Sequence, residues 1–237
     1  MIAPDKRPER IATMFDAIAP RYDLLNTLLS AGFDRRWRAR AIEALRLTGT
    51  EILLDVCTGT GDVALAARHA GAARRVVGVD FAGAMLALGL AKVTKAREAA
   101  AISLVRGDAT RLPVRSGRVD AVTVAFGIRN VEKPGEACEE MARVLRPGGR
   151  LAILEFGAPR IPGIRSAYRL YFTHLLPRVG GLVSRHGTAY SYLPASVDAF
   201  PPPEQFADLL RRAGFSEVRA VPLTFGIVYL YTATRAA

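Results

Sequence analysis

The chain has 237 residues, enough for one α/β domain with a full hydrophobic core and an added elaboration. Its two cysteines exclude a disulfide framework and a zinc-binding spacing, and its longest uncharged stretch, Ala220–Thr234, is shorter than the roughly 20 apolar residues of a membrane helix. The formal net charge of +11 indicates a polyanionic partner, nucleic acid or an anionic membrane surface, unless it reflects a generic basic surface.

The first residues, MIAPDKRPER, are charged and lack the apolar region of a signal peptide. We therefore expect a cytoplasmic protein whose contact with the inner face of the membrane is peripheral. Residues 1–50 are expected to be largely helical, and they include the amphipathic stretch DRRWRARAIEAL.

From residue 51 onward, short apolar runs alternate with helical patterns. The expected strands are Glu51–Cys57, Arg75–Asp80, Ile102–Arg106, Val119–Phe126 and Arg150–Phe156. The expected helices between them are Asp62–Ala70, about Ala82–Arg97, and Gly135–Leu145. The last of these helices should stop at the RPGG stretch, where Pro147 cannot continue it and a glycine can take the C′ position. This alternation predicts a parallel, doubly wound sheet.

The end of the chain breaks the alternation. After a helix at Pro203–Ala213, two strand-like runs, Glu217–Leu223 and Ile227–Ala233, are separated by only a few residues. So short a connection cannot hold a crossover helix, which makes the two strands antiparallel. A seven-stranded sheet that ends in an antiparallel hairpin is typical of Rossmann-like, class I S-adenosylmethionine-dependent methyltransferases rather than of NAD enzymes.

Residues 157–202 form a connection far longer than the fold requires, and such connections are usually functional. This one contains five arginines, one acid and a set of aromatic side chains: Tyr168, Tyr171, Phe172, Tyr190, Tyr192 and Phe200. We interpret it as a substrate lid. The predicted organisation is a single methyltransferase domain over 1–237, with a helical cap (1–50), a cofactor-binding core (51–156), the lid (157–202), and a last helix with the closing hairpin (203–237).

The turn after the first strand reads LDVCTGTGD, and it would form one wall of a nucleotide cofactor site. Gly59 and Gly61, on either side of Thr60, let the backbone approach a ligand without a Cβ in the way. The same turn also satisfies a loose dinucleotide pattern, so an NAD enzyme is a second reading. Asp55 precedes the glycines, where methyltransferases commonly have an acid, and Cys57 fills the first-glycine position as a packing residue.

The ends of the other strands help to choose the cofactor. Asp80 lies about 20 residues beyond the glycines, where an acid can accept from both ribose hydroxyls, and Phe81 next to it can flank the adenine. Asp108 and Ala109 follow the third strand, where methyltransferases often bind the adenine amino group. Ala125 ends the fourth strand. Together with Asp55, the RPGG stretch and the closing hairpin, these features favour S-adenosylmethionine over NAD.

Several motifs along the chain carry a resemblance to one enzyme family. They are Tyr22-Asp23-x-x-Asn26, Leu29-Ser30 before Arg36-Trp37, the Asp55–Asp62 loop, the FGIRN stretch (126–130), Glu155-Phe156, and AYSYLPASVDAFP from Ala189. The chain resembles the ubiquinone/menaquinone-biosynthesis C-methyltransferases nearly from end to end. The resemblance implies methylation of a ring carbon on a polyprenylated quinol, with demethylmenaquinol favoured and the equivalent benzoquinol step of ubiquinone biosynthesis as the alternative.

The chemistry implied by this resemblance needs a carbon nucleophile made from a hydroquinol, and hence a base or an oxyanion stabiliser. We assign Arg129 to the developing phenolate, directly or through a water, and Asn130 to the ring hydroxyl. Asp108 would support this pair while also contacting the cofactor, and Tyr22 with Asp23 would close over its methionine end. His174 and Tyr190 are weaker candidates for proton transfer. The three histidines show no metal spacing, so we expect no metal.

The basic excess then has an explanation, because a polyprenyl quinol resides in the bilayer. Five arginines of the predicted lid would contact anionic headgroups: Arg160, Arg165, Arg169, Arg178 and Arg185. A nucleic-acid methyltransferase is the main rival, but an amino-methylating enzyme needs a (D/N)PP(Y/F) motif after the fourth strand, where this chain has AFGIRN. A catalytically inactive scaffold is a second rival. We expect no nucleic-acid partner, and a homodimer is left open.

Overall fold

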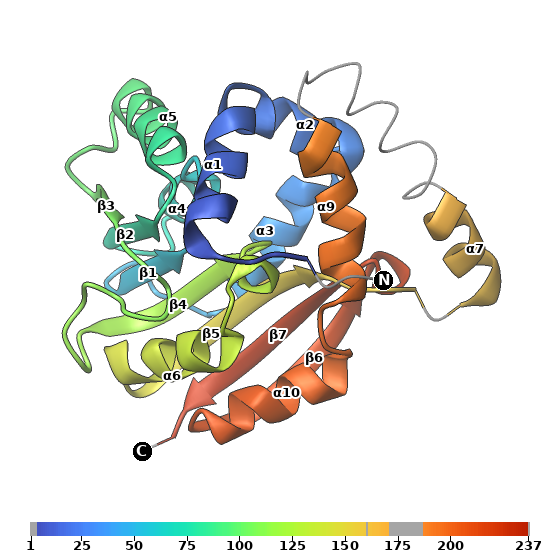
Figure 1. Ribbon diagram of the computed structural model, residues 1–237. Helices are drawn as coiled ribbons and strands as arrows, with labels where there is room; N and C mark the ends of the chain where they lie inside the picture. Colours follow the sequence, from blue (N-terminus) through green and yellow to red (C-terminus); the bar gives the residue numbers. More distant parts are fainter. Residues whose placement is uncertain (1–3, 160, 171–186, 237) are drawn as a thin grey trace.

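A seven-stranded sheet in the order β3-β2-β1-β4-β5-β7-β6 forms the centre of the molecule. The computed structural model describes residues 4–159, 161–170 and 187–236 (Figure 1). The strands are β1 Ile52–Val56, β2 Arg75–Asp80, β3 Ile102–Arg106, β4 Val119–Ala125, β5 Leu145–Phe156, β6 Phe215–Leu223 and β7 Val228–Arg235. Strands β1 to β5 are parallel, whereas β7 is antiparallel to both β5 and β6. The predicted fold class and its closing hairpin are therefore confirmed.

Helices cover both faces of the sheet and its carboxyl edge. They are α1 Pro8–Ile18, α2 Tyr22–Leu29, α3 Phe33–Ala44, α4 Asp62–His69, α5 Gly83–Lys95, α6 Pro134–Val144, α7 Pro162–Leu170, α9 Gly187–Asp198 and α10 Pro203–Arg212. Short 3₁₀ turns occupy Ala19–Arg21, Ile128–Asn130 and Thr224–Gly226. The predicted helical character of the first 50 residues is confirmed.

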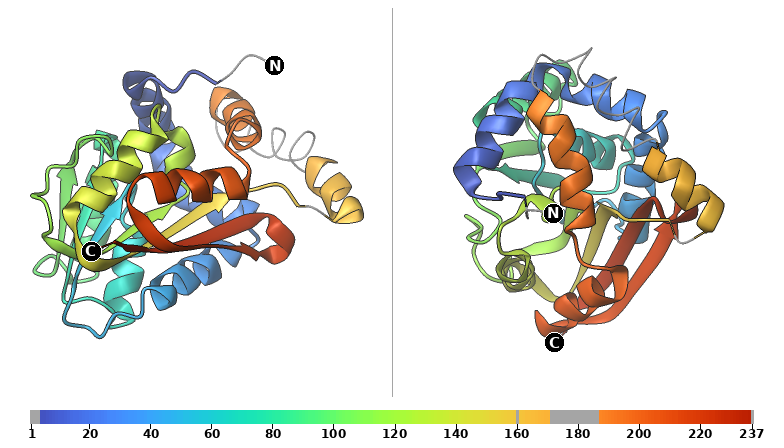
Figure 2. Two further views of the ribbon diagram at one scale, coloured as in Figure 1. Left: turned by 90° about the horizontal axis from the view of Figure 1, so that it is seen from below. Right: turned by 45° about the vertical axis from the view of Figure 1, so that its right-hand side comes forward.

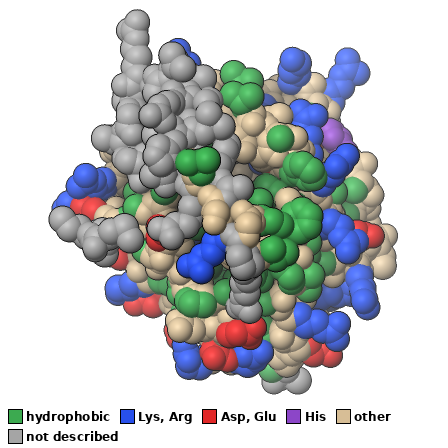
Figure 3. Space-filling view, turned by 90° about the vertical axis from the view of Figure 1, so that its right-hand side faces the viewer, with side chains coloured by type: hydrophobic (Ala, Val, Ile, Leu, Met, Phe, Trp, Pro, Cys, Tyr) green, Lys and Arg blue, Asp and Glu red, His purple; other side chains and the backbone are tan. Residues whose placement is uncertain are grey.

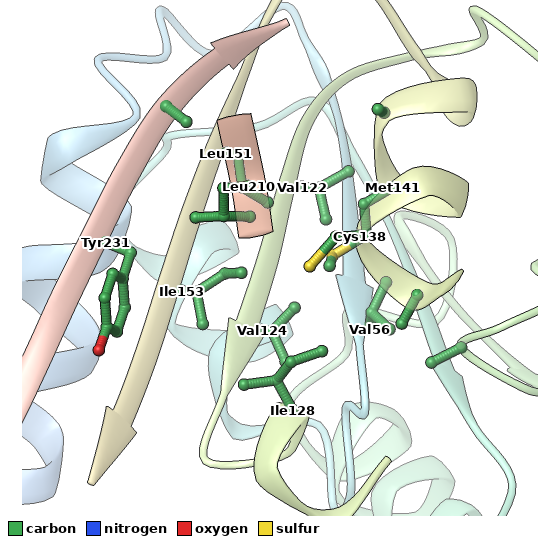
Figure 4. Close-up of a cluster of buried hydrophobic side chains, with 14 of the residues drawn as sticks. Val56, Val122, Val124, Ile128, Cys138, Met141, Leu151, Ile153, Leu210 and Tyr231 are labelled. Atoms are coloured by element: carbon green, nitrogen blue, oxygen red, sulfur yellow. The ribbon is translucent and has the colours of Figure 1, made fainter. Parts of the chain in front are cut away.

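Two apolar clusters hold the layers together, one on each face of the sheet. Side chains of β4, such as Val122 and Val124, meet Cys138 and Met141 of α6 and Leu210 of α10 on one face (Figure 4). The other face packs against α3, α4 and α5. Because successive side chains of a strand point to opposite faces, an almost continuous apolar run is what a sheet covered on both sides requires.

The end of α6 differs from the prediction. The helix ends at Val144, Leu145 already has extended backbone angles, and β5 begins there rather than at Arg150. The RPGG stretch is a bulge within the strand, since two residue steps along β4 correspond to five along β5, and Gly148 there has a φ of +73°. The predicted glycine at C′ was wrong, because pairing of Leu145 with Val119 in the sheet ended the helix first.

The segment predicted as a lid contains α7 and α9, and α9 packs beside α1 (Figures 1 and 2). The predictions for Arg160, Tyr171, Phe172, His174, Arg178 and Arg185 fall outside the described residues, as do those for the side chains of Arg169 and Tyr190. In the described ranges no helix is both long and apolar enough to cross a membrane. The proposed division of the domain into cap, core, lid and hairpin stays a prediction.

Candidate active site

The loop between β1 and α4 carries the glycines singled out in the sequence. Its backbone turns through left-handed angles at Cys57, Gly59 and Gly61, with φ values of +55°, +56° and +78°. The Gly59 N–H donates to Oδ2 of Asp80 at 2.8 Å, which holds the loop against the end of β2. A Cβ built on Gly59 would meet only the Tyr22 ring, at 3.9 Å. The loop backbone is therefore left accessible on the side of α2.

Asp80 at the end of β2 is buried and has capacity for a ligand. Its carboxylate accepts hydrogen bonds from the backbone N–H groups of Gly59 and Ala82, at 2.8 and 2.9 Å. Burial raises the pKa of Asp80, and hydrogen bonds from the backbone N–H groups of Ala82, Gly59 and Phe81 oppose that rise. An ionised carboxylate has about four acceptor sites, so acceptor capacity remains for a hydroxyl group of a ligand.

A small cavity of about 40 Å³ lies beside this loop. It is lined by Phe15, Tyr22, Cys57, Gly59, Asp80, Phe81, Met85, Ala125, Phe126, Gly127, Asn130 and Val131. Five of the residues predicted to bind the cofactor are thus brought together: Tyr22, Gly59, Asp80, Phe81 and Ala125. The cavity is smaller than the roughly 300–1,000 Å³ of typical ligand sites, so the side chains that close it must shift for a cofactor to bind.

Asp55, Thr60 and Gly61 do not line this cavity; they hold the loop instead. The fully buried carboxylate of Asp55 accepts from the hydroxyls of Thr58 (2.6 Å) and Thr123 (2.9 Å), and burial raises its pKa to about 6. Gly61 immediately precedes the first residue of α4. Asp55 therefore acts on the loop through Thr58.

A polar network joins Thr60 to the cap. The Thr60 hydroxyl donates to Asp23 of α2 at 2.6 Å. Lys92 of α5 donates to Asp23 at 2.8 Å, to Thr60 at 3.1 Å and to Asp62. Lys92 was not predicted from the sequence, since a lysine in the middle of a helix carries no signal of its own. The network fastens the helical cap over the glycine loop.

Asp108 lies apart from the other predicted catalytic residues. It is exposed, and its carboxylate accepts from the backbone N–H and the hydroxyl of Thr110, at 2.8 and 2.9 Å. Neither Asp108 nor Ala109 lines a cavity, and Ala109 packs in the hydrophobic core. The structure does not bring Asp108 to Arg129 and Asn130. The prediction that Asp108 supports these two residues is therefore wrong.

Glu155 at the end of β5 takes that supporting place. Arg129 is buried in the 3₁₀ turn after β4, and its Nη1 donates to Glu155 Oε1 at 2.8 Å and to the Phe126 carbonyl. Its backbone N–H donates to Glu155 Oε2 at 3.1 Å, and its Nε to the Ser196 hydroxyl of α9 at 3.3 Å. The guanidinium carbon lies 5.2 Å from the centre of the Phe156 ring. Glu155 belongs to the Glu155-Phe156 motif of the family resemblance, but its pairing with Arg129 was not predicted from the sequence.

A second, larger cavity of about 400 Å³ borders the first, and Phe15, Tyr22 and Phe126 line both. Its remaining lining residues are Met14, Ile18, Leu25, Asn26, Leu29, Ser30, Ala31, Phe33, Asp34, Trp37, Arg38, Arg129, Phe156, Ile164, Tyr168, Tyr192, Leu193, Thr224 and Ile227. The size is that of a site for a small organic molecule. Its wall is dominated by apolar and aromatic side chains, with Arg129 as a cation available to an anionic ring oxygen.

Two buried polar atoms beside these cavities lack a hydrogen-bond partner among the described residues. One is Oδ1 of Asn130, a residue of the small cavity and not of the large one, and the other is the hydroxyl of Tyr192, a residue of the large cavity. Burial raises the pKa of Tyr192 to about 12, so the phenol is neutral and can donate. Buried polar groups are normally satisfied, so an unpaired one in a cavity wall is available to a ligand atom or a water.

The residues of the small cavity fit S-adenosylmethionine. Asp80 offers acceptors to ribose hydroxyls, Phe81 offers an apolar surface to the adenine, and Asn130 offers an unpaired acceptor to a cationic group. Cys57 is a neutral thiol there, because burial raises its pKa well above the ordinary value. Among the described residues, no group of three or more His, Cys, Asp or Glu side chains is placed to hold a metal ion.

Comparison with known proteins places the geometry in context. Residues 4–235 match the sequence model of the ubiE/COQ5 methyltransferase family. A protein of Syntrophotalea carbinolica named ubiquinone/menaquinone biosynthesis C-methyltransferase UbiE is 48% identical over 98% of this chain and 94% of its own length. A demethylmenaquinone methyltransferase of Bacteroides fragilis is 43% identical over 97% of this chain and 94% of its own length.

Solved structures at lower identity show the fold. A putative S-adenosylmethionine-dependent methyltransferase of Methanococcus maripaludis has a TM-score of 0.68 at 16% identity, covering all of this chain and 98% of its own. The [4+2]-cyclase SpnF reaches a TM-score of 0.71 at 18% identity, with the same coverage. A cyclase on this fold illustrates that architecture alone does not assign a reaction.

Proposed function

The chain belongs to the ubiE/COQ5 methyltransferase family, and from this membership we propose that it methylates a ring carbon of a polyprenylated quinol, with S-adenosylmethionine as the donor. It is a C-methyltransferase of respiratory quinone biosynthesis. One observation carries the chemical part of the proposal. Arg129, held by Glu155, lies in the wall of an apolar cavity that shares lining residues with the cavity next to Asp80 and Gly59.

Residues of the small cavity would hold the donor. Asp80 would accept from the ribose hydroxyls, Phe81 would cover the adenine, and the Gly59 backbone would approach the methionine end. The unpaired Oδ1 of Asn130 is a suitable acceptor for the cationic part of the donor, an alternative to its proposed contact with the ring hydroxyl. When bound, S-adenosylmethionine supplies an electrophilic methyl group on a sulfonium.

Arg129 would stabilise the quinol as a phenolate, which makes the neighbouring ring carbon nucleophilic. Its Nε and Nη1 are engaged by Ser196, Glu155 and Phe126, whereas Nη2 has no hydrogen bond to the described residues and stays available. A fixed cation stabilises developing negative charge without reorganising at the moment of reaction. Arginine side chains do not act as bases in proteins, so the quinol proton passes to an acceptor other than Arg129.

The aromatic wall of the large cavity would hold the ring and exclude water. Phe126, Phe156 and Trp37 are mutually in contact, with ring centres 4.7 to 6.5 Å apart. We propose a naphthoquinol, demethylmenaquinol, as the substrate, because a relative at 43% identity is named for that reaction. The benzoquinol step is the second candidate, because the relative at 48% identity is named for both pathways.

The membrane is the proposed source of this substrate. The net charge of +11 favours peripheral contact with anionic lipid at the cytoplasmic face. Of the arginines predicted to contact headgroups, Arg165 is exposed on α7.

A methyl-transfer assay tests the proposal. The purified protein is given labelled S-adenosylmethionine with a short-chain demethylmenaquinol, with the corresponding benzoquinol, or with transfer RNA. We expect methylation of the naphthoquinol. Label on RNA, or on no acceptor, would overturn the proposal, and label on the benzoquinol alone would move the function to the ubiquinone step.

A further inference from the structure

Most of the exposed apolar side chains belong to the elements around the large cavity. Ten large hydrophobic residues are exposed in the described part of the chain, and six lie in or next to α2, α3, α7 and the 3₁₀ turn 224–226. We call these six the apolar rim: Leu24, Leu28, Phe33, Ile161, Leu170 and Phe225. Figure 3 looks onto this side of the molecule and shows hydrophobic side chains gathered near its centre, with Lys and Arg around them.

Phe225 occupies an unfavourable backbone conformation at the tip of the closing hairpin. The φ angles of Thr224, Phe225 and Gly226 are +44°, +59° and +86°, and a bulky residue in this region is strained. The Phe225 side chain is nevertheless 66% exposed. The Trp37 indole N–H donates to the Thr224 hydroxyl at 2.8 Å, which fixes the tip beside α3. A strained aromatic side chain that is two-thirds exposed is available for contact with a partner outside the fold.

Helix α2 adds a second exposed apolar element. Leu24 and Leu28 lie one helical turn apart, and they are 63% and 54% exposed. Their neighbours Leu25 and Leu29 line the large cavity, so the helix presents apolar side chains both inward and outward. A helix of a soluble domain normally places charged and polar residues on its outer face. The outer face of α2 is therefore suited to an apolar environment.

The charges around the rim are mainly positive. Residues 21–40 contain four exposed arginines (Arg21, Arg35, Arg36 and Arg40), the buried Arg38, and two acids, Asp23 and Asp34. Both acids are engaged in ion pairs, with Lys92 and Arg38 respectively. The Arg36 guanidinium carbon lies 5.4 Å from the centre of the Phe33 ring. Apolar side chains bordered by arginines match the layered chemistry of an anionic lipid surface, with acyl chains below and phosphates above.

We propose that the apolar rim inserts into an anionic phospholipid bilayer, with Phe225, Leu24 and Leu28 below the headgroups and the exposed arginines of 21–40 among the phosphates. This inference rests on the proposed function, since it gives a polyprenyl tail a route from the acyl chains into the large cavity without crossing water. The six rim residues lie on the cap, at α7 and at the hairpin tip, and they would add apolar contacts to those of the lid arginines considered above.

Vesicle flotation tests the rim directly. Leu28→Ser and Phe225→Asn remove apolar contacts outside the cavity lining, and asparagine tolerates the φ of +59°. Leu90→Ser on α5 is the matched control, because Leu90 is 57% exposed and α5 does not line the large cavity. With vesicles of phosphatidylglycerol and phosphatidylcholine, we expect the wild type to bind, and its binding to weaken with salt. The vesicle affinity of the Leu28→Ser/Phe225→Asn double variant should fall at least tenfold. The affinity of Leu90→Ser should change less than twofold.

Activity measurements separate this inference from the proposed function. The double variant should methylate a short-chain quinol in solution like the wild type, yet lose most activity on a long-chain quinol in vesicles. The proposal that the rim binds lipid is overturned if wild type and double variant bind vesicles equally. It is also overturned if Leu90→Ser loses as much vesicle binding as the double variant. A wild-type dimer in sedimentation that the double variant lacks, without a change in vesicle binding, makes the rim a self-association surface. Lipid binding without quinol methylation overturns the proposed function but leaves the rim standing.

Discussion

Arg129 and Glu155 form a buried ion pair, with Nη1 and Oε1 2.8 Å apart, that joins the turn after β4 to the end of β5. The pair exists because β4 and β5 are neighbouring parallel strands, so their carboxyl ends meet at one edge of the sheet. The geometry fixes the guanidinium before any substrate arrives. It also makes this arginine a structural element as well as a candidate for catalysis.

Removing one member of the pair should destabilise the protein. Arg129→Gln or Glu155→Gln leaves a buried charge without its partner, and such changes cost about 3–5 kcal/mol. The Arg129→Gln/Glu155→Gln double variant should lose less than the sum of the two single changes. Urea unfolding of the four proteins gives the coupling energy. Additive losses would mean that the pair contributes no coupling.

Replacing Asp80 should weaken cofactor binding. Asp80→Asn keeps one acceptor oxygen, which must serve the N–H groups of Gly59 and Ala82 as well as a ribose hydroxyl. We expect at least a tenfold lower affinity for S-adenosylhomocysteine by calorimetry. Asp208→Asn, an exposed change on α10, is the control. An unchanged affinity in Asp80→Asn would remove its ribose assignment.

A larger side chain at Gly127 should be compensated by a smaller one at Cys57. A Cβ on Gly127 would lie 2.3 Å from Cβ of Cys57, so Gly127→Ala must displace the loop that lines the small cavity. We expect Gly127→Ala to abolish binding of S-adenosylhomocysteine. Cys57→Gly relieves both the contact and the φ of +55°, so the Cys57→Gly/Gly127→Ala double variant should recover binding. Failure of the double variant to recover would locate the defect elsewhere.

Asp55 should make stability depend on pH. Burial raises its pKa from 3.8 to about 6, so the folded state holds this proton more tightly than the unfolded chain does. Its contribution to stability is therefore largest below pH 4, falls as pH rises from about 4 to about 6, and then stays constant. A pKa difference of about two corresponds to about 3 kcal/mol.

The Asp55→Asn variant checks this sign. Asparagine stays neutral and can still pair with the hydroxyls of Thr58 and Thr123. Its free energy of unfolding in urea should match that of the wild type near pH 4 and exceed it above pH 6. Parallel curves over this range would show that the Asp55 proton is not linked to folding.

Phe225→Gly should stabilise the hairpin. Glycine adopts the φ of +59° without strain, and the exposed ring contributes little packing. We expect a gain of about 1 kcal/mol in the free energy of unfolding, together with weaker vesicle binding. Leu223→Gly, in the adjacent strand β6, is a control with the opposite expected sign, and it should lower the free energy of unfolding. A loss of stability in Phe225→Gly would show that the ring packs.

Local patterns predicted most of the elements. Strands β2 and β3 have the predicted bounds, because each is an apolar run between polar or glycine-containing segments. The early start of β5 was not predictable in this way. Leu145 belongs to the strand only because it pairs with Val119, and that pairing depends on a residue 26 positions earlier in the chain.

The sequence by itself determined the fold class, the family resemblance and five of the twelve residues that line the small cavity, since the glycine loop and Asp80 lie at the ends of consecutive strands. Only the tertiary structure decided which acid supports Arg129. Asp108 and Glu155 both follow or end a parallel strand, so local sequence cannot choose between them. In the folded sheet β2 and β1 separate β3 from β4, whereas β5 lies directly beside β4. A buried guanidinium pairs with the carboxylate within its reach, and the strand order makes that carboxylate Glu155.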